Sequence, residues 1–275
     1  MHSGGAVGTG ARIGSGVRWI PPLRASGSLQ MAIDEELLDA AVAAGERARP
    51  VLRLYQWRRP TLSLGFHQRA IEPVWSAQAL EGRLDLVRRP SGGRAVLHGG
   101  DLTYALIWPA PGLPRMMAYR RACLWLQEVF AELGQPLQFG DHRPTSVASS
   151  CFALATAADL IHPGGSKRIG SAQLWRRGHL LQHGSIQLAP SGSLWRLLFD
   201  EAPPGLPALP IDTPGLMARL ADAAEALWGG LESQPLTPQE RRAAWARRDR
   251  YRLPLETGSA SAAGTSPLPS MPRAT

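Results

Sequence analysis

Residues 84–98 read Leu84-Asp85-Leu86-Val87-Arg88-Arg89-Pro90-Ser91-Gly92-Gly93-Arg94-Ala95-Val96-Leu97-His98. The alternating residues up to Arg89 predict a strand, and Pro90 to Gly93 predict the turn that ends it. Glycine has no Cβ, so such a turn can approach a ligand closely and present its amide groups to a carbonyl or phosphate oxygen. A hairpin turn that simply requires glycine is the alternative. The pattern is neither a phosphate loop nor a dinucleotide-binding fingerprint.

Periodicity on both sides of this stretch predicts the remaining elements. An amphipathic helix is expected over residues 28–44, and strands over 51–57 and 61–65, joined by an Arg58-Arg59-Pro60 turn. Further strands are expected over residues 102–108, 158–161, 168–175 and 179–188, and helices over 116–133, 193–199, 213–231 and 241–251, the last behind a capping-box start at Thr237. The order favours an α+β fold, with a mainly antiparallel sheet flanked by helices and a helical C-terminal part at about residues 191–256.

The two ends of the chain differ in composition from the middle. Residues 1–16 and 257–275 are rich in Gly, Ser, Ala and Pro, and we expect them to be disordered. One domain is therefore expected over residues 17–256 of the 275.

The composition and charge of the chain indicate which classes of protein it can belong to. No apolar run is long enough to span a membrane, and the N-terminus lacks the apolar core of a signal peptide, so a cytoplasmic location without membrane association is expected. Two cysteines and no zinc-type spacing predict reduced thiols and no metal. The net charge of +8 comes from scattered arginines without a nucleic-acid-binding motif, so an acidic protein partner is favoured over nucleic acid.

Lys167 is the only lysine in the chain, against 29 arginines. Lysine and arginine are equivalent as solvated charge, but only lysine supplies a compact ammonium with three donors to a small acceptor. A functional position and a compositional accident are both open on this observation alone.

Cys151 lies 16 residues before Lys167, in a stretch that also contains Ser146, Ser149 and Ser150. A thiol becomes a nucleophile where a nearby cation favours its thiolate, so Cys151 is the candidate nucleophile. Cys123 falls on the apolar face of the helix predicted over 116–133 and is expected to be a small buried hydrophobe.

Two histidines accompany these residues. His183 could serve Cys151 as a general base, although its place in an alternating strand favours orientation of a loop. His98 is expected to shape a pocket rather than to carry protons.

These stretches, taken in order, resemble the biotin and lipoate protein ligase family (lipoate-protein ligase A/B). More specifically, they resemble the cysteine-dependent octanoyl-acyl carrier protein:protein N-octanoyltransferases. The likeness is dense over about residues 25–190 and looser beyond them. Its motifs are Met31–Glu35, Leu52–Tyr55 with Trp57, Pro60–Gly65 with Gln68, Val87–His98 with Leu102–Tyr104, Ser149–Phe152, Lys167 with Gly170–Gln173, and Gly178 with Leu181–Ile186.

The resemblance implies a biotinyl/lipoyl protein ligase-like fold with a class II synthetase-like core. It places the acyl chain in a tunnel beside the Gly-Gly loop, with Lys167 at the acyl carbonyl and Cys151 as the nucleophile. The substrate-binding residues that it implies are Arg89, Ser91, Gly92, Gly93, His98, Gly170, Ser171 and Ala172.

The function implied is octanoyl transfer in lipoate biosynthesis. The donor is octanoyl-acyl carrier protein, the intermediate a cysteine thioester, and the acceptor a lysine of a lipoyl-domain protein, either glycine-cleavage H protein or 2-oxoacid dehydrogenase E2. No cofactor is expected. One alternative is an ATP-dependent lipoate-protein ligase of the same fold, which would not need Cys151. Another is a non-catalytic binder of acylated carrier proteins, which would tolerate Lys167→Arg.

The chain departs from the family pattern at two points. Arg168 occupies a position that is usually apolar, which could perturb how the strand carries Lys167. Gly99 and Gly100 follow His98 where an acidic residue is common, so the entrance of the pocket could differ.

Overall fold

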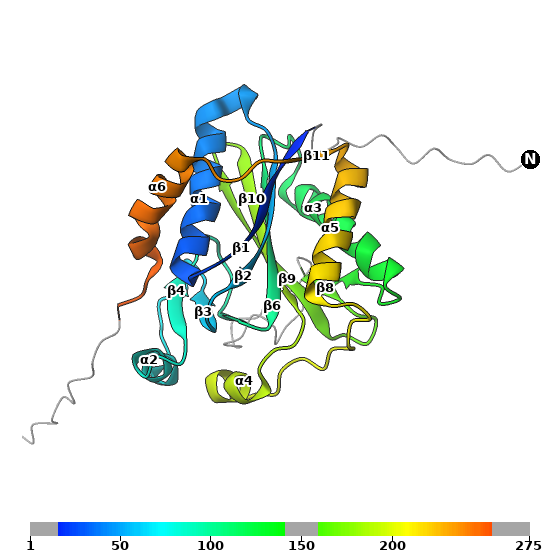
Figure 1. The fold of residues 1–275 in the computed structure, drawn as a ribbon. Helices are drawn as coiled ribbons and strands as arrows, with labels where there is room; N and C mark the ends of the chain where they lie inside the picture. The colour runs from blue at the N-terminus through cyan, green and yellow to red at the C-terminus, as the bar shows by residue number, and fades with distance from the viewer. Residues whose placement is uncertain (1–15, 141–158, 255–275) are drawn as a thin grey trace, which may run out of the picture.

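The computed structural model describes residues 16–140 and 159–254. A mixed eight-stranded sheet runs through the middle of the molecule in the order β11-β1-β2-β6-β10-β9-β8-β7 (Figure 1). Within it, β1 pairs in parallel with β2 and β11, and the other neighbours are antiparallel. The strands are β1 Val17–Ala25, β2 Val51–Trp57, β6 Asp101–Trp108, β7 Gln138–Phe139, β8 Asp159–Ile161, β9 Lys167–Arg176, β10 His179–Gln187 and β11 Leu231–Ser233.

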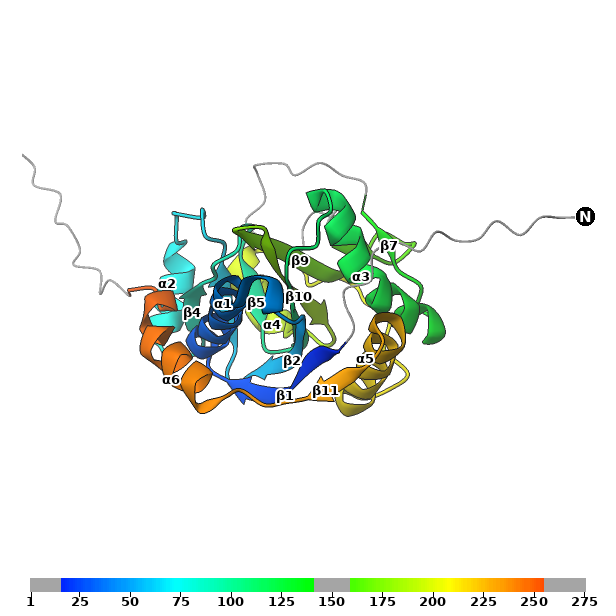
Figure 2. The same cartoon turned by 90° about the horizontal axis from the view of Figure 1, so that it is seen from above.

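Helices cover both faces of this sheet (Figure 2). Helix α1 (Gly27–Ala44) packs on one face, with α6 (Pro238–Arg247) outside it, while α3 (Arg115–Glu132) and α5 (Thr213–Trp228) pack on the other. Two hydrophobic cores result, one on each side. The expected α+β class, with a mainly antiparallel sheet flanked by helices, is confirmed.

A second sheet carries the Gly-Gly loop. Strands β3 (Thr61–Leu64), β4 (Asp85–Arg88) and β5 (Val96–His98) pair in the order β4-β3-β5, and the loop joins β4 to β5. Helices α2 (Pro73–Leu80) and α4 (Gly192–Phe199) enclose a third core on this sheet. Strands β2 and β3 were both predicted, but the Arg58-Arg59-Pro60 turn sends them into different sheets instead of pairing them.

Several boundaries differ from the sequence prediction for identifiable reasons. Helix α5 ends at Trp228 because Gly229 and Gly230 adopt positive φ values of 81° and 117°, which terminate a helix. The capping box at Thr237 is confirmed, and α6 begins at Pro238 and passes at Arg248 into a 3₁₀ turn, Arg248–Tyr251. Strand β11 lies within the part predicted to be helical and pairs with β1, so the two ends of the domain meet in one sheet.

Candidate active site

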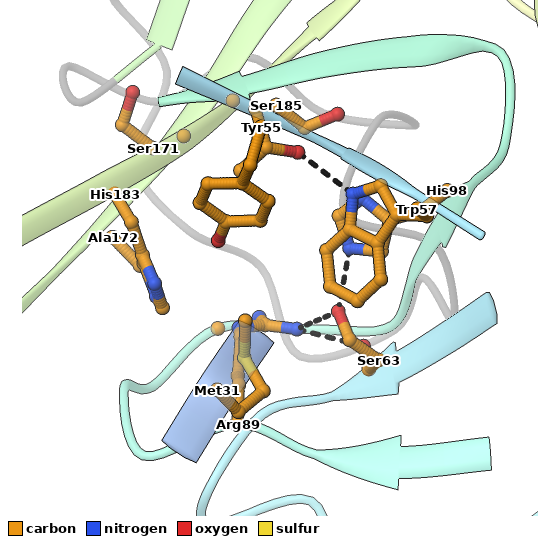
Figure 3. Close-up of a pocket in the computed structure, with 14 residues that line it drawn as sticks. Met31, Tyr55, Trp57, Ser63, Arg89, His98, Ser171, Ala172, His183 and Ser185 are labelled. Carbon is orange, nitrogen blue, oxygen red and sulfur yellow. Dashed lines mark hydrogen bonds between the residues drawn. The ribbon is translucent and has the colours of Figure 1, made fainter. Parts of the chain in front are cut away.

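A pocket of about 430 Å³, counting the space that opens to solvent, lies between the two sheets. Its floor is formed by neighbouring segments of β9 and β10, namely Gly170–Ala172 and His183–Ser185. Its walls come from α1, β2, β3, β5, β6 and the Gly-Gly loop, through Met31, Tyr55, Trp57, Ser63, Arg89, Gly93, His98 and Thr103 (Figure 3).

Six of the residues proposed to bind substrate line this pocket: Arg89, Gly93, His98, Gly170, Ser171 and Ala172. Ser91 and Gly92 belong to the same loop but do not line the pocket in the described structure. Lys167 lies three residues before Gly170 on β9 and is likewise not among the lining residues. Cys151 lies outside the described residues.

Arg89 holds the loop in place from inside. Its guanidinium donates to the carbonyl oxygens of Gly92 (2.8 Å) and Arg94 (2.6 Å) in the loop, and to the carbonyl oxygen of Ser63 (2.7 Å) on β3. These bonds satisfy carbonyls that the turn leaves without strand partners. Arg89 therefore organises the loop as well as lining the pocket.

Glycine is required where the loop crosses β3. A Cβ on Gly65 would lie 1.8 Å from the carbonyl oxygen of Gly93, closer than any real contact. Gly93 itself has φ of 94°, a conformation that side chains disfavour. The amide of Phe66 also donates to the carbonyl oxygen of Ser91 (2.9 Å), so the two backbones are locked together.

His183 connects the loop to the large sheet and to α1. Its Nε2 lies 2.5 Å from Ser91 Oγ, and its Nδ1 lies 3.0 Å from Asp34 Oδ2. Asp34 is fully buried and also accepts from Arg53 (2.7 Å) and from the Tyr55 hydroxyl (2.9 Å). Burial and the Asp34 carboxylate raise the pKa of Tyr55 well above its ordinary value, so this phenol stays a donor.

His98 belongs to a second chain of the same kind. Its Nε2 lies 2.9 Å from Ser63 Oγ and its Nδ1 lies 2.7 Å from Asp101 Oδ2, while its ring stacks on Trp57 at 3.8 Å between centroids (Figure 3). Burial lowers the pKa of His98 despite Asp101, which favours the neutral ring. Burial alone would raise the pKa of Asp101, but His98, Ser185 and the Gly99 amide together lower it.

Asp101 bears on the second departure from the family pattern, at Gly99 and Gly100. The acidic residue common directly after the family histidine is replaced by Gly99, yet Asp101, two residues further on, bonds both the His98 ring and the Gly99 amide (3.0 Å). Thr103 and Ser185 donate to the same carboxylate, at 3.0 and 2.6 Å. A buried carboxylate with four donors thus stands behind His98.

Lys167 begins strand β9 as a buried residue, and its ammonium forms an ion pair with Asp159 on β8 at 2.9 Å. Both side chains are 3% exposed or less, so the ammonium is held away from solvent. Asp159 was not identified from the sequence, where it formed part of an ordinary edge strand.

Arg168 is also fully buried and is accommodated by neutral acceptors. It donates to His162 Nε2 (3.0 Å), to the Gln187 carbonyl (2.9 Å), to Gln135 Oε1 (3.1 Å) and to the Pro207 carbonyl (2.5 Å). Burial lowers the pKa of its guanidinium to about 10. The unusual arginine therefore ties the start of β9 to four neighbouring segments.

Cys123 is fully buried, and its Sγ accepts from Gln182 Nε2 at 3.2 Å. Burial raises the pKa of its thiol to about 12, which keeps it protonated. The prediction of a small buried hydrophobe is confirmed.

The part of the site that sequence reasoning missed is its set of supporting polar residues. Asp34 is hydrogen-bonded to His183, and Ser63 and Asp101 are hydrogen-bonded to His98. The Tyr104 hydroxyl forms a hydrogen bond with the hydroxyl of Ser171 (2.8 Å) on the pocket floor. A signal existed in polar residues at otherwise apolar positions, such as Asp34 within the face of α1. Ser63 and His98 are 35 residues apart and Asp34 and His183 are 149 residues apart, so no local pattern connects these partners.

Metal and membrane features are absent from the described part of the chain. Residues 16–140 and 159–254 contain no group of three His, Cys, Asp or Glu arranged to hold a metal ion. No helix in those ranges is long and apolar enough to span a membrane.

Comparison with known proteins identifies the family. Octanoyltransferase LipM of Carboxydothermus hydrogenoformans is 39% identical over 174 residues, 62% of this chain and 64% of that protein, which is less than two thirds of its length. The LipM proteins of Kyrpidia tusciae and Symbiobacterium thermophilum are 35% and 36% identical over 80% of this chain, and 90% and 80% of their own lengths.

Solved structures share the fold at low identity. Lipoate-protein ligase A bound with ATP has a TM-score of 0.70 at 16% identity, over 86% of this chain and 95% of that one. A bipartite lipoate protein ligase from Thermoplasma acidophilum has a TM-score of 0.66 at 16% identity, over 86% and 93%. The sequence model of the lipoyl protein ligase A/B catalytic domain matches residues 26–203, and the chain belongs to that family.

Proposed function

We propose that this protein is an octanoyltransferase of lipoate biosynthesis that works through a thioester on Cys151. The observation that carries the proposal is the 35–39% identity to three proteins named octanoyltransferase LipM, joined to a pocket formed by the motifs that carry the resemblance. The donor is octanoyl-acyl carrier protein, and the acceptor is a lysine of a lipoyl-domain protein, H protein or E2.

The first step is attack of the Cys151 thiolate on the donor thioester carbonyl. The carbon–sulfur bond to the carrier breaks, and the carrier sulfur leaves as a thiolate, which takes up the proton that Cys151 lost when it ionised. Negative charge develops on the carbonyl oxygen, and the amides of Gly92 and Gly93 with the Lys167 ammonium are the proposed donors to it. A well-placed donor of this kind contributes about 3–4 kcal/mol.

The second step is attack of the acceptor amine on the acyl-enzyme. An amide bond forms, Cys151 is released, and one proton is lost from the amine. Passing from thioester to thioester to amide is downhill, so no ATP and no other cofactor are needed. The net charge of +8 suits an acidic carrier protein.

Intact-protein mass spectrometry after mixing with octanoyl-acyl carrier protein, without ATP, tests the proposal. The expected result is one octanoyl group on the peptide containing Cys151, released by hydroxylamine and absent in Cys151→Ala. Modification of a lipoyl domain by free octanoate that requires ATP and survives Cys151→Ala would support the ligase instead. Stable binding of the carrier without turnover would support the binding protein.

A further inference from the structure

The Asp34–His183–Ser91 chain has the atom order of a hydrolase triad. Ser91 Oγ lies 2.5 Å from Nε2 of His183, and Nδ1 lies 3.0 Å from the Asp34 carboxylate. In a triad this arrangement activates the serine as a nucleophile. The alternative is that the same bonds hold the serine, and the segment that follows it, in one position.

The burial of Ser91 favours the second role, in which the serine is held in place. Ser91 is 1% exposed and does not line the pocket, whereas His183 and Gly93 do. The carbonyl oxygen of Ser91 is held by the Phe66 amide on the other side. A thioester in the pocket would therefore meet the loop at Gly93 and not at the Ser91 hydroxyl.

We infer that His183, oriented by Asp34, is a positioning residue that fixes Ser91 and thereby the Gly92–Gly93 amides at the acyl carbonyl. This inference rests on the proposed transfer reaction, in which those amides stabilise the oxyanion. In this role Asp34 and His183 act through the loop and not on the reacting atoms.

The hydrogen-bond partners of His183 indicate which of its ring nitrogens carries a proton. Asp34 accepts from Arg53 and from Tyr55, so it is the acceptor for Nδ1–H of His183 as well. When the ring is neutral, its Nε2 is then unprotonated and accepts a hydrogen bond from the Ser91 hydroxyl. A ring with its proton on Nε2 would face Asp34 with a lone pair, so the carboxylate fixes both the tautomer and the ring plane.

Asp34 is suited to this task because it cannot rotate freely. Its Oδ1 is bonded to Arg53 of β2, its Oδ2 is bonded to Tyr55 of β2, and the side chain is fully buried on α1. The loop is thereby tied to α1, β2 and β10 on one side. Arg89, which bonds the Gly92 and Arg94 carbonyls and Ser63, ties it on the other.

A matched pair of substitutions at His183 isolates the bond to Ser91. In His183→Asn the side-chain amide nitrogen occupies the place of Nδ1 and keeps a donor toward Asp34, but the shorter side chain does not reach Ser91. In His183→Gln the amide reaches the place of Nε2 and can bond Ser91. Ser91→Ala removes the hydroxyl alone, and Ser91→Thr restores it. His67→Gln, at an exposed histidine that packs on Phe66, is the control.

The readout is single-turnover formation of the octanoyl-enzyme as a function of carrier concentration, with urea unfolding of every variant in parallel. Ser91→Ala and His183→Asn are expected to lower the maximal rate by on the order of 100-fold, as for a misplaced catalytic group, with half-saturation unchanged. His183→Gln and Ser91→Thr are expected to recover at least part of that rate, and His67→Gln to match the unaltered protein.

Three results would overturn the inference: equal rates for His183→Asn and His183→Gln in folded protein, a Ser91→Ala rate equal to that of the unaltered protein, or octanoyl groups mapped to Ser91. If unaltered protein forms no octanoyl-enzyme at all, the proposed function fails, and the variants are then compared by the rate of the ATP-dependent reaction. Equal rates for all the variants there would overturn the positioning role as well.

Discussion

The Lys167 ammonium lies 2.9 Å from a carboxylate oxygen of Asp159, and both side chains are buried. The two residues stand on neighbouring strands β8 and β9, whose register shifts between Leu160 and Ile161 just beside them. The only ammonium side chain of the protein is thus held at the strand end that leads into the pocket floor at Gly170. Asp159 therefore positions Lys167, just as His183 positions the Gly-Gly loop.

Breaking this pair by Asp159→Ala is expected to lower the free energy of unfolding by about 3 kcal/mol, because it removes the carboxylate that pairs with a buried ammonium. Urea unfolding measures the change. Glu232→Gln, which breaks the exposed Arg49–Glu232 pair, is the control and should change stability by less than about 1 kcal/mol. Equal effects of the two substitutions would contradict the importance of burial.

Lys167→Arg keeps the charge but replaces a compact ammonium with a planar guanidinium in a buried space. If Lys167 donates to the acyl carbonyl, formation of octanoyl-enzyme should slow by roughly 100-fold, as on loss of one oxyanion donor. Stopped-flow or quenched-flow mass spectrometry measures the rate. A variant that is folded and fully active would remove Lys167 from the proposed mechanism.

Gly65→Ala is expected to reduce both stability and transfer, since the new Cβ would lie 1.8 Å from the Gly93 carbonyl oxygen and push the loop away from β3. Overpacking of this kind costs about 1–3 kcal/mol. Gly205→Ala is the matched control, because a Cβ there meets no atom within 4 Å. Thermal unfolding and single-turnover rates of the two variants should differ; similar values would show that the loop adapts.

The sequence predicted most of the fold because the decisive elements are locally periodic. Helix α1, strands β2 and β6 and the strand pair β9 and β10 all lie within a few residues of their predicted ranges. Strand β1 was missed because Pro21 and Pro22 interrupt it, and a bulge between Ile20 and Leu23 absorbs them. Strand β11 has three residues and is defined only by its pairing with β1, which no local pattern shows.

The loop residues of the candidate site could be predicted from the sequence, but the buried polar residues that hold them in place could not. Arg89, Gly93 and His98 were found because they lie in one continuous motif. Asp34 was visible as an acidic residue in the predicted helix and as part of the Met31–Glu35 motif, and neither observation gave it a partner. Its function as the partner of Arg53, Tyr55 and His183 depends on the packing of α1 against the sheet. These contacts form only in the tertiary structure, so residue spacing does not predict them.

Cys123 and Cys151 should be separable by their thiol chemistry. Because Cys123 is fully buried with a pKa near 12, it is expected to resist alkylation until the protein unfolds. Cys123→Ala should preserve octanoyl transfer and lower stability by about 1 kcal/mol, since Gln182 loses an acceptor. Peptide mapping after iodoacetamide treatment, with and without urea, checks the first point. Loss of transfer in a folded Cys123→Ala protein would instead assign this thiol a role in the reaction.

Stability should fall as the pH is lowered below about 6.5, and His98 should account for part of the fall. Burial lowers the pKa of His98 in the folded protein, with Arg89 and His183 acting in the same direction and Asp101 opposing them. The unfolded chain therefore binds a proton near the ordinary histidine pKa of about 6.5, while the folded protein does not until the pH is lower.

Since the unfolded state then carries more protons, the free energy of unfolding decreases with falling pH, by at most about 1.4 kcal/mol per pH unit for this one group. Asp101 adds nothing in this range, because its lowered pKa places its contribution below about pH 4. Urea unfolding at pH 7.5, 6.5 and 5.5 should show a shallower slope for His98→Gln than for the unaltered protein. Identical slopes would mean that folding leaves the pKa of His98 unchanged, and a steeper slope for His98→Gln would mean that folding raises it.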